Sequence, residues 1–206
     1  MKVLAGVEQP SKGEVFLHGD KVHIPDPTAA YNLGISIVHQ ELVQIPFMTV
    51  AENIYCGRYP KKAGLVDFAA LERQAEELMS RLDIHFDPSS LIVQYSVAHR
   101  QLIEIMKALS YNSKIIVFDE PTAALTTDEC EILFRIIRQL QTEGVSIIFI
   151  SHRMTDITAV GTRVQVLRDG KVSGGGSVDE LSIDDIIKLM VGRDLTNQFP
   201  PKTNTP

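Results

Sequence analysis

The sequence predicts an α/β protein with a parallel β-sheet core, an inserted helical block and a small antiparallel β-hairpin. Two short apolar runs, 115–118 and 145–150, end abruptly in polar residues, which is typical of strands buried inside a parallel sheet. Segments with helical periodicity alternate with these runs, and this alternation favours a doubly wound sheet. Between residues 42 and 109 the apolar residues recur at helical spacing, which indicates helices inserted into the core.

Composition and charge narrow the class of protein. At 206 residues, with 44% hydrophobic and 22% charged residues, the chain is long enough for one well-packed domain. A formal net charge of -6 argues against a general nucleic-acid binder. Cys56 and Cys130 lack the spacing of a metal or disulfide framework, which suits a reducing compartment. No stretch resembles a membrane span or signal peptide, so we expect a cytoplasmic protein, or one attached to a membrane through partners.

The first 40 residues predict small elements in order. Residues 1–6 have the pattern of the last turns of a helix that is closed by Gly6. Residues 14–17 and 21–24 alternate around a turn and predict a hairpin. The sequence then predicts a short helix over 28–33 and a strand over 35–38 that ends at His39 and Gln40.

Two helices are predicted in the middle block. Asp67 is placed to cap the first helix, and a second runs over 97–109. Their expected inner faces are Phe68, Leu71, Ala75, Leu78, Met79 and Leu82 for the first, and Leu102, Ile105, Met106 and Leu109 for the second.

The last third continues the alternation of strands and helices. After the strand at 115–118 we expect a helix over 128–143 that is stopped by Gly144, and then the strand over 145–150. An edge hairpin over 163–173 and a helix from Ser182 to Val191, with Asp185 in its first turn, complete the prediction. The expected domains are residues 1–195, with the helical subdomain inserted at about 45–112, and a linker over 196–206.

Two carboxylates follow the strand at 115–118. Ligands bind off the carboxyl ends of the strands in open α/β sheets, so Asp119 and Glu120 are expected to face a metal and a phosphate. The alternative is a core strand followed by a helix-capping Asp. That alternative explains the apolar run but leaves the sequence Glu120-Pro121-Thr122 without a reason.

Three other polar residues occupy comparable places. Gln40 ends the strand over 35–38 and can reach toward Mg²⁺ and water, and His152 follows the strand over 145–150. Ser96 immediately precedes a helix, where free amides and the helix dipole favour anions. Each residue also has an ordinary structural interpretation: a polar loop residue, a structural histidine and a Ser N-cap.

Together these residues resemble the ATP-binding cassette (ABC) ATPases in identity, order and approximate spacing. The matching positions are the Q-loop Gln40, the signature Ser96-Val97-Ala98, the Walker B residues Asp119 and Glu120, the D-loop 123–126 and the switch His152. The chain most resembles the first nucleotide-binding half of double-cassette ATPases of bacterial monosaccharide importers, such as those for ribose, galactose and xylose. Tyr95 and His99 depart from the usual Leu and Gln of the signature.

The resemblance implies a P-loop NTPase-like fold, ATP and Mg²⁺ as cofactors, and defined roles for individual residues. Asp119 and Gln40 would serve Mg²⁺, while Glu120, His152 and Gln40 would be catalytic. Ser96, Val97 and Ala98 would contact nucleotide held by the opposite cassette, and Gln40 and His152 would contact nucleotide on their own cassette. The implied partners are a second cassette, in the same longer chain or a homodimer, and membrane permease subunits. A periplasmic or extracellular sugar-binding protein would be an indirect partner, and no nucleic acid is expected. The resemblance places this chain at the cytoplasmic face of the cell membrane, attached through the permease subunits.

One family motif does not occur in the sequence. No G-x-x-x-x-G-K followed by Ser or Thr is present, so we expect a piece of a longer ATPase or a truncated reading frame, inactive on its own. Three hypotheses stay open: a transport ATPase for sugar import, a catalytically silent cassette that dimerises and regulates, and a soluble ABC ATPase of translation or DNA repair. The acidic charge and the absence of a long coiled-coil insertion count against the third.

Overall fold

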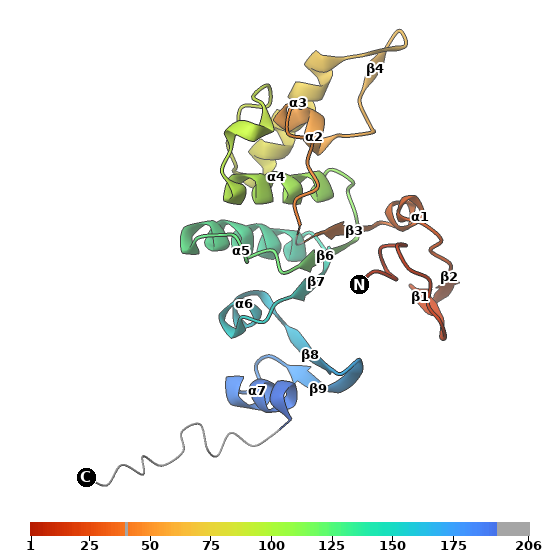
Figure 1. Ribbon diagram of the computed structural model, residues 1–206, viewed down its shortest axis with the longest axis vertical. Coiled ribbons are helices and arrows are strands. Elements are labelled where there is room, and N and C mark those ends of the chain that lie inside the picture. The colour runs from red at the N-terminus through yellow and green to blue at the C-terminus, as the bar shows by residue number, and fades with distance from the viewer. Residues whose placement is uncertain (40, 193–206) are drawn as a thin grey trace, which may run out of the picture. The chain divides into compact units, whose positions relative to one another are not determined.

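The computed structural model describes residues 1–39 and 41–192. The chain divides into two compact units, Met1–His152 and a second unit from Arg153 onward. Figure 1 shows the elements of both units in chain order. Two predictions fall on positions outside the described residues, namely the placement of Gln40 and the linker over 196–206.

A parallel three-stranded sheet forms the centre of the first unit, in the order β3 (Ile35–Val38), β6 (Ile115–Asp119) and β7 (Ser146–Ile150). In β6, Ile116, Val117 and Phe118 are at most 1% exposed, which agrees with the apolar run predicted as a core strand. The four apolar residues of β7 are only half-buried. The predicted parallel-sheet fold is therefore confirmed, with β3 and β6 more buried than β7.

In the first unit, one helix precedes these strands in the chain and the others lie between them. α4 packs against both α2 and β3, α3 packs against α2, and α5 packs against β7. In Figure 1, α2, α3 and α4 gather beside one another. The predicted inner face of α4 is confirmed, because all four of its expected residues are buried. The helices of this unit are α1 (Pro27–Asn32), α2 (Val50–Ile54), α3 (Phe68–Leu82), the 3-10 helix η1 (Ile92–Gln94), α4 (Val97–Leu109) and α5 (Thr127–Thr142).

Two expectations about this unit are wrong. Residues 1–6 form a hydrogen-bonded turn rather than the end of a helix, with the Ala5 N–H donating to the Met1 carbonyl at 3.1 Å. Gly6 has φ +69°, and a Cβ there would lie 2.3 Å from the Asp26 carbonyl oxygen, so glycine is required. Phe68 is 55% exposed because it begins α3, one turn before the buried part of that helix face.

The first unit also contains two hairpins, one before the helical block and one within it, between α2 and α3. The predicted hairpin pairs β1 (Val15–Leu17) with β2 (Asp20–Val22), and both turn residues, His18 and Gly19, have positive φ. A second hairpin joins β4 (Lys61–Lys62) to β5 (Leu65–Val66). Its turn residues, Ala63 and Gly64, also have positive φ. The sequence does not predict this hairpin, because strands of two residues are too short to show alternation.

The second unit contains α6 (Met154–Val160), β8 (Arg163–Arg168), β9 (Lys171–Ser177) and α7 (Ile183–Val191). Val164 and Val166 on β8 and Ile186 on α7 form its buried core. The predicted hairpin is present, but β8 and β9 form a two-stranded sheet of their own rather than an edge of the parallel sheet. Ser182 caps α7 together with Asp185, as predicted.

Strand β9 also continues to Ser177, beyond the expected end at residue 173. Glycines at 174 and 176 leave room for Leu189 and Leu181, whose side chains would lie 2.7 Å and 3.3 Å from a Cβ at those positions. None of the helices in the described part of the chain has both the length and the apolar character needed to span a bilayer.

Candidate functional site

The carboxyl end of β6 holds the two predicted carboxylates. Asp119 is the last residue of the strand and lies opposite Ile150 of β7. Glu120 follows with φ +49°, and its N–H donates to the Ile150 carbonyl at 3.0 Å. A left-handed backbone costs a non-glycine residue about 1 kcal/mol, so the hydrogen bond to β7 offsets this cost and fixes the turn. Both carboxylates are half-buried at this edge of the sheet.

His152 reaches the same edge from the end of β7. Its Nδ1 lies 3.2 Å from Oε1 of Glu120, although the two residues are 32 positions apart in the chain. The side chain of His152 is 68% exposed and that of Glu120 is 30% exposed, so solvent and ligands can reach both. A hydrogen bond here requires a proton on Nδ1, because a carboxylate only accepts. The structure thus brings two of the predicted catalytic residues together.

The segment after Glu120, predicted as a D-loop, is fixed at both ends. The Ala123 N–H donates to the Glu120 carbonyl at 3.3 Å, which closes a turn directly after the carboxylate. At its other end Thr126 caps α5 with Glu129, whose Oε2 accepts from the Thr126 N–H at 2.8 Å. This backbone hydrogen bond and the bond from the Thr126 hydroxyl lower the pKa of Glu129.

Ser96 lies at the start of α4, in the position that the signature motif predicts. Its Oγ accepts from the His99 N–H at 3.2 Å, so the residue does act as an ordinary N-cap. Ser96 and Val97 are exposed and Ala98 is half-buried. The cap uses Oγ as an acceptor and leaves its hydroxyl proton available for another contact. The polar contact of Ser96 is local to its helix, whereas Glu120 is held by a neighbouring strand.

The two departures from the signature pattern pack against each other. Phe86 lies edge-on to both Tyr95 and His99, with ring centroids 5.2 Å and 5.5 Å apart. Tyr95 and His99 are themselves 6.2 Å apart, and the Tyr95 hydroxyl accepts from the Asp87 N–H at 3.2 Å. These residues fix the loop before α4 to its first turn. The sequence signalled both departures but gave no sign that they share Phe86.

The metal-binding groups at the carboxyl edge of β6 and β7 suit Mg²⁺ better than a transition metal. Among residues 1–39 and 41–192, no group of three or more His, Cys, Asp or Glu residues could hold a metal ion. Asp119 offers a carboxylate, a hard oxygen ligand, and Gln40 lies outside the described residues. Mg²⁺ in phosphate-transfer sites takes only one or two carboxylates and completes its shell with water and phosphate oxygens. The residues present therefore fit Mg²⁺ bound together with a phosphate.

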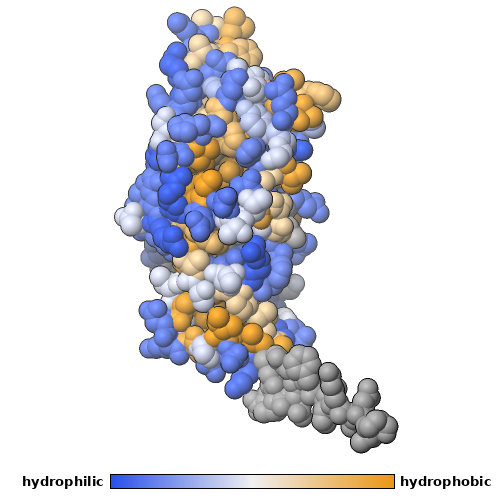
Figure 2. Space-filling model, turned by 90° about the vertical axis from the view of Figure 1, so that its left-hand side faces the viewer, coloured by the Kyte–Doolittle hydropathy of each residue, from blue (hydrophilic) through white to orange (hydrophobic). Residues whose placement is uncertain are grey.

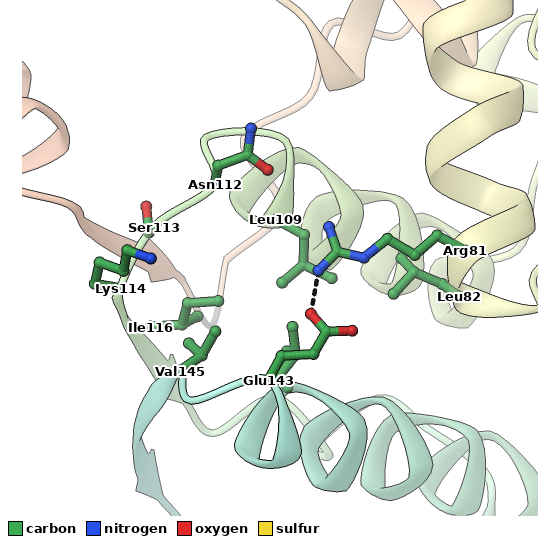
Figure 3. Close-up of a pocket in the computed structure, with 10 residues that line it drawn as sticks. Arg81, Leu82, Leu109, Asn112, Ser113, Lys114, Ile116, Glu143 and Val145 are labelled. Atoms are coloured by element: carbon green, nitrogen blue, oxygen red, sulfur yellow. Dashed lines mark hydrogen bonds and ion pairs between the residues drawn. The ribbon is translucent and has the colours of Figure 1, made fainter.

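A separate pocket of about 160 Å³ lies at the amino ends of β6 and β7, the opposite edge of the sheet (Figure 3). The Arg81–Glu143 ion pair forms part of its lining, and Lys114 lies on the other side (Figure 3). None of the predicted site residues within the described ranges lines it. No sequence pattern indicated this pocket, because its walls combine the carboxyl-terminal ends of three helices, the loop before β6, and residues at or just before the starts of two strands. The other lining residues are Leu82, Leu109, Asn112, Ser113, Ile116, Leu140 and Val145.

Comparison with known sequences places this geometry in a family. The model of a family described as ABC transporter matches residues 1–123. The chain is 45% identical over 201 residues to a putative ribose/galactose/methyl galactoside import ATP-binding protein of Rhizobium johnstonii, covering 97% of this chain and 39% of the relative. It is 44% identical over 206 residues to the ribose import ATP-binding protein RbsA 1 of Rubrobacter xylanophilus, covering 100% and 41%. The chain spans about two fifths of the length of these curated relatives.

Solved structures agree with the fold. The ADP conformation of MJ1267, an ATP-binding cassette of an ABC transporter, superimposes with a TM-score of 0.77 at 22% identity, covering 93% of this chain and 82% of that chain. A dimeric post-hydrolysis state of the ATP-binding cassette MJ0796, bound to ADP and Pi, gives a TM-score of 0.72 at 22% identity, covering 86% and 78%. These similarities concern the fold, while the family model covers more than half of the sequence. The chain therefore belongs to the ABC transporter family.

Proposed function

We propose that this chain is the ATP-binding and ATP-hydrolysing cassette of an importer for monosaccharides. The observation that carries the proposal is the contact between Glu120 and His152 at the carboxyl edge of the sheet, with Asp119 beside them. The names of the relatives, which are ribose and galactose import ATP-binding proteins, support the substrate class.

Each residue at the sheet edge has a separate role in phosphoryl transfer from ATP to water. Glu120 orients and polarises the attacking water, and His152, next to it, contacts the γ-phosphate. Asp119 would hold Mg²⁺, which would supply positive charge to neutralise the phosphate oxygens when bound. Gln40, which would contact both Mg²⁺ and the attacking water, lies outside the described residues. Catalysis then rests on positioning and electrostatics rather than on a covalent intermediate.

The start of α4 serves a second nucleotide. Ser96, Val97 and Ala98 present a hydroxyl and free amides at a helix N-terminus, which favours a phosphate. In this proposal the phosphate belongs to ATP held by an opposing cassette, so two cassettes close around nucleotide. The partner cassette belongs to the same longer protein or to a second copy.

An exposed apolar surface supports a membrane partner. We define it as Val43, Ile45, Phe47 and Val93, which are 63%, 43%, 81% and 51% exposed. Figure 2 shows how apolar side chains reach the surface in patches between hydrophilic ones on one face of the molecule. The Val93 N–H donates to the Pro46 carbonyl at 3.3 Å, so Val93 lies beside the segment that carries the other three residues. Exposed apolar residues gathered in this way mark interaction sites. We infer that permease subunits bind this apolar surface at the cytoplasmic face of the membrane, and that a sugar-binding protein acts only through them.

A catalytically silent, dimerising cassette is the second candidate. The observation in its favour is that the sequence contains no G-x-x-x-x-G-K followed by Ser or Thr. That loop supplies the amides and the lysine that bind the phosphates of ATP. When the loop is supplied, the active cassette should hydrolyse ATP, whereas the silent cassette should bind ATP without hydrolysing it.

Calorimetric titration with MgATP tests both candidates. The 206-residue chain alone should bind MgATP more weakly than micromolar and should hydrolyse it no faster than its Glu120→Gln variant. An extended protein, in which the chain is joined to a phosphate loop and a second cassette, should hydrolyse ATP. A micromolar dissociation constant for the chain alone would contradict the expected dependence on the loop. Nucleotide binding without hydrolysis in the extended protein would favour the silent cassette.

A further inference from the structure

The segment of residues 42–48 carries most of the apolar surface. From Leu42 to Ile45 the residues alternate between half-buried and exposed, so Gln44 faces inward between exposed Val43 and Ile45. The chain then turns, and the Met48 N–H donates to the Ile45 carbonyl at 3.1 Å. The segment therefore presents apolar side chains outward and the side-chain amide of Gln44 inward.

That amide forms a reciprocal pair with α4. Nε2 of Gln44 donates to the Arg100 carbonyl at 2.6 Å, and Nε of Arg100 donates to Oε1 of Gln44 at 3.0 Å. Both residues are half-buried, and they are 56 positions apart. Because the amide donates at one end and accepts at the other, the pair fixes both the position and the orientation of the segment against the helix.

Arg100 belongs to the turn that carries Ser96. The Arg100 N–H donates to the Ser96 carbonyl at 2.9 Å, and the His99 N–H donates to the Ser96 hydroxyl. Further along the same helix, Nζ of Lys107 donates to the Val43 carbonyl at 3.3 Å. A displacement of the segment must therefore either break these bonds or move the first turn of α4.

We propose that Gln44 and Arg100 are positioning residues that couple the apolar surface to the Ser96 turn. Binding of a protein partner at the surface would change the placement of Ser96, and closure on nucleotide at Ser96 would change the segment, because coupling between two sites is reciprocal. The proposal rests on the proposed function, since it requires nucleotide at Ser96 and a partner at the apolar surface.

The other side of the segment is anchored independently of this pair. Asn53 of α2, which is 3% exposed, accepts from the Ile45 N–H at 2.8 Å and donates to the Ile45 carbonyl at 3.2 Å. Cutting the Gln44–Arg100 pair should therefore leave the segment folded against α2. A variant of Gln44 can lose the coupling without losing the fold.

Hydrogen exchange in the 206-residue chain gives the first test. Gln44→Leu removes both bonds and keeps a side chain of similar size. We expect amide exchange of His99 and Arg100 to become roughly three- to tenfold faster, the range expected for one net hydrogen bond. Unchanged exchange at both amides, with faster exchange confined to residues 42–48, would overturn the proposal.

The matched control is Gln139→Leu. Nε2 of Gln139 also makes two hydrogen bonds, to the Arg81 carbonyl at 3.3 Å and to Oε1 of Glu143 at 3.1 Å. It lies on α5, so its loss should leave exchange at His99 and Arg100 unchanged. An equal increase in both variants would show a general loss of stability and would also overturn the proposal.

The extended protein tests the coupling itself. Closure is measured by nucleotide-dependent cross-linking between cassettes, and the response is measured as exchange of residues 42–48 with and without nucleotide. We expect closure to slow this exchange at least threefold in the wild type, and Gln44→Leu and Arg100→Lys to close without that change. A full response in both variants, or none in the wild type, would overturn the coupling. If Ser96→Arg leaves closure intact, the proposed role of Ser96 fails instead, which separates the two failures.

Discussion

The carboxyl edge of β6 and β7 and the first turn of α4 both expose polar groups, yet they are built in different ways. At the sheet edge, Glu120 is held by the Ile150 carbonyl and meets His152, which comes from a different strand. At α4, Ser96 caps its own helix and contacts an amide three residues later. The first arrangement depends on strand pairing and the second on local sequence. Substitutions at the edge should therefore affect chemistry, and substitutions at the turn should affect contact with a partner.

The largest effect is expected at the sheet edge. Glu120→Gln in the extended protein should lower the rate of ATP hydrolysis by about 10²- to 10⁴-fold, the usual contribution of a general base. The measurement is steady-state phosphate release, with Glu131→Gln, on the exposed face of α5, as the matched control. Turnover at the wild-type rate would show that Glu120 is not the catalytic carboxylate.

The next effect separates the two regions directly. Ser96→Arg should prevent nucleotide-dependent closure but leave ATP binding to this cassette nearly intact, because the bulky side chain would occupy the place of a phosphate held in trans. Asp119→Asn should instead weaken Mg²⁺ binding in this cassette. Cross-linking between cassettes and calorimetry for each nucleotide site provide the two readouts.

Ser182→Arg is the control for Ser96→Arg. Ser182 caps α7 with its hydroxyl, as Ser96 caps α4, and Asp185 adds a reciprocal bond at α7 only. This change therefore removes a cap without touching the signature. It should leave closure unchanged. Suppose instead that Ser96→Arg abolishes nucleotide binding to this cassette and preserves closure. Ser96 would then contact nucleotide bound by its own cassette rather than by the opposing one.

The smallest effect concerns the cap that follows the sheet edge. The pKa of Glu129 is lowered chiefly by its hydrogen bond from the Thr126 N–H, so the ionised form stabilises the folded state. This contribution is present above the pKa of an unfolded Glu, about 4.3, and is lost as the pH falls through the lower pKa of the folded state. Because the carboxylate is exposed, Glu129→Gln should cost only about 0.5 kcal/mol at pH 7.

Urea denaturation at pH 7 and at pH 3 measures this difference. The gap between the wild type and Glu129→Gln should narrow at the lower pH, where the carboxylate takes up a proton. The same gap at both pH values would show that the ionised form of Glu129 contributes nothing specific to the cap.

The sequence alone determined the features that depend on a few neighbouring residues. The apolar run at 115–118 predicted the buried central strand, because a short apolar run bounded by polar residues and a proline is typical of a strand covered on both faces. Asp67, Ser96 and Ser182 were recognisable as helix starts, because a cap bonds to an amide within three residues. The order of the motifs also pointed to the family, which the family model confirmed.

The tertiary structure alone decided which distant residues meet. The 3.2 Å contact of His152 with Glu120, the Gln44–Arg100 pair and the packing of Phe86 on Tyr95 and His99 join residues that no local pattern relates. The same holds for the pairing of β8 and β9 as a sheet of their own. Hydrophobic periodicity shows which face of an element is buried, but the partner of that face is set by how whole elements pack, and packing depends on the shape of the entire core.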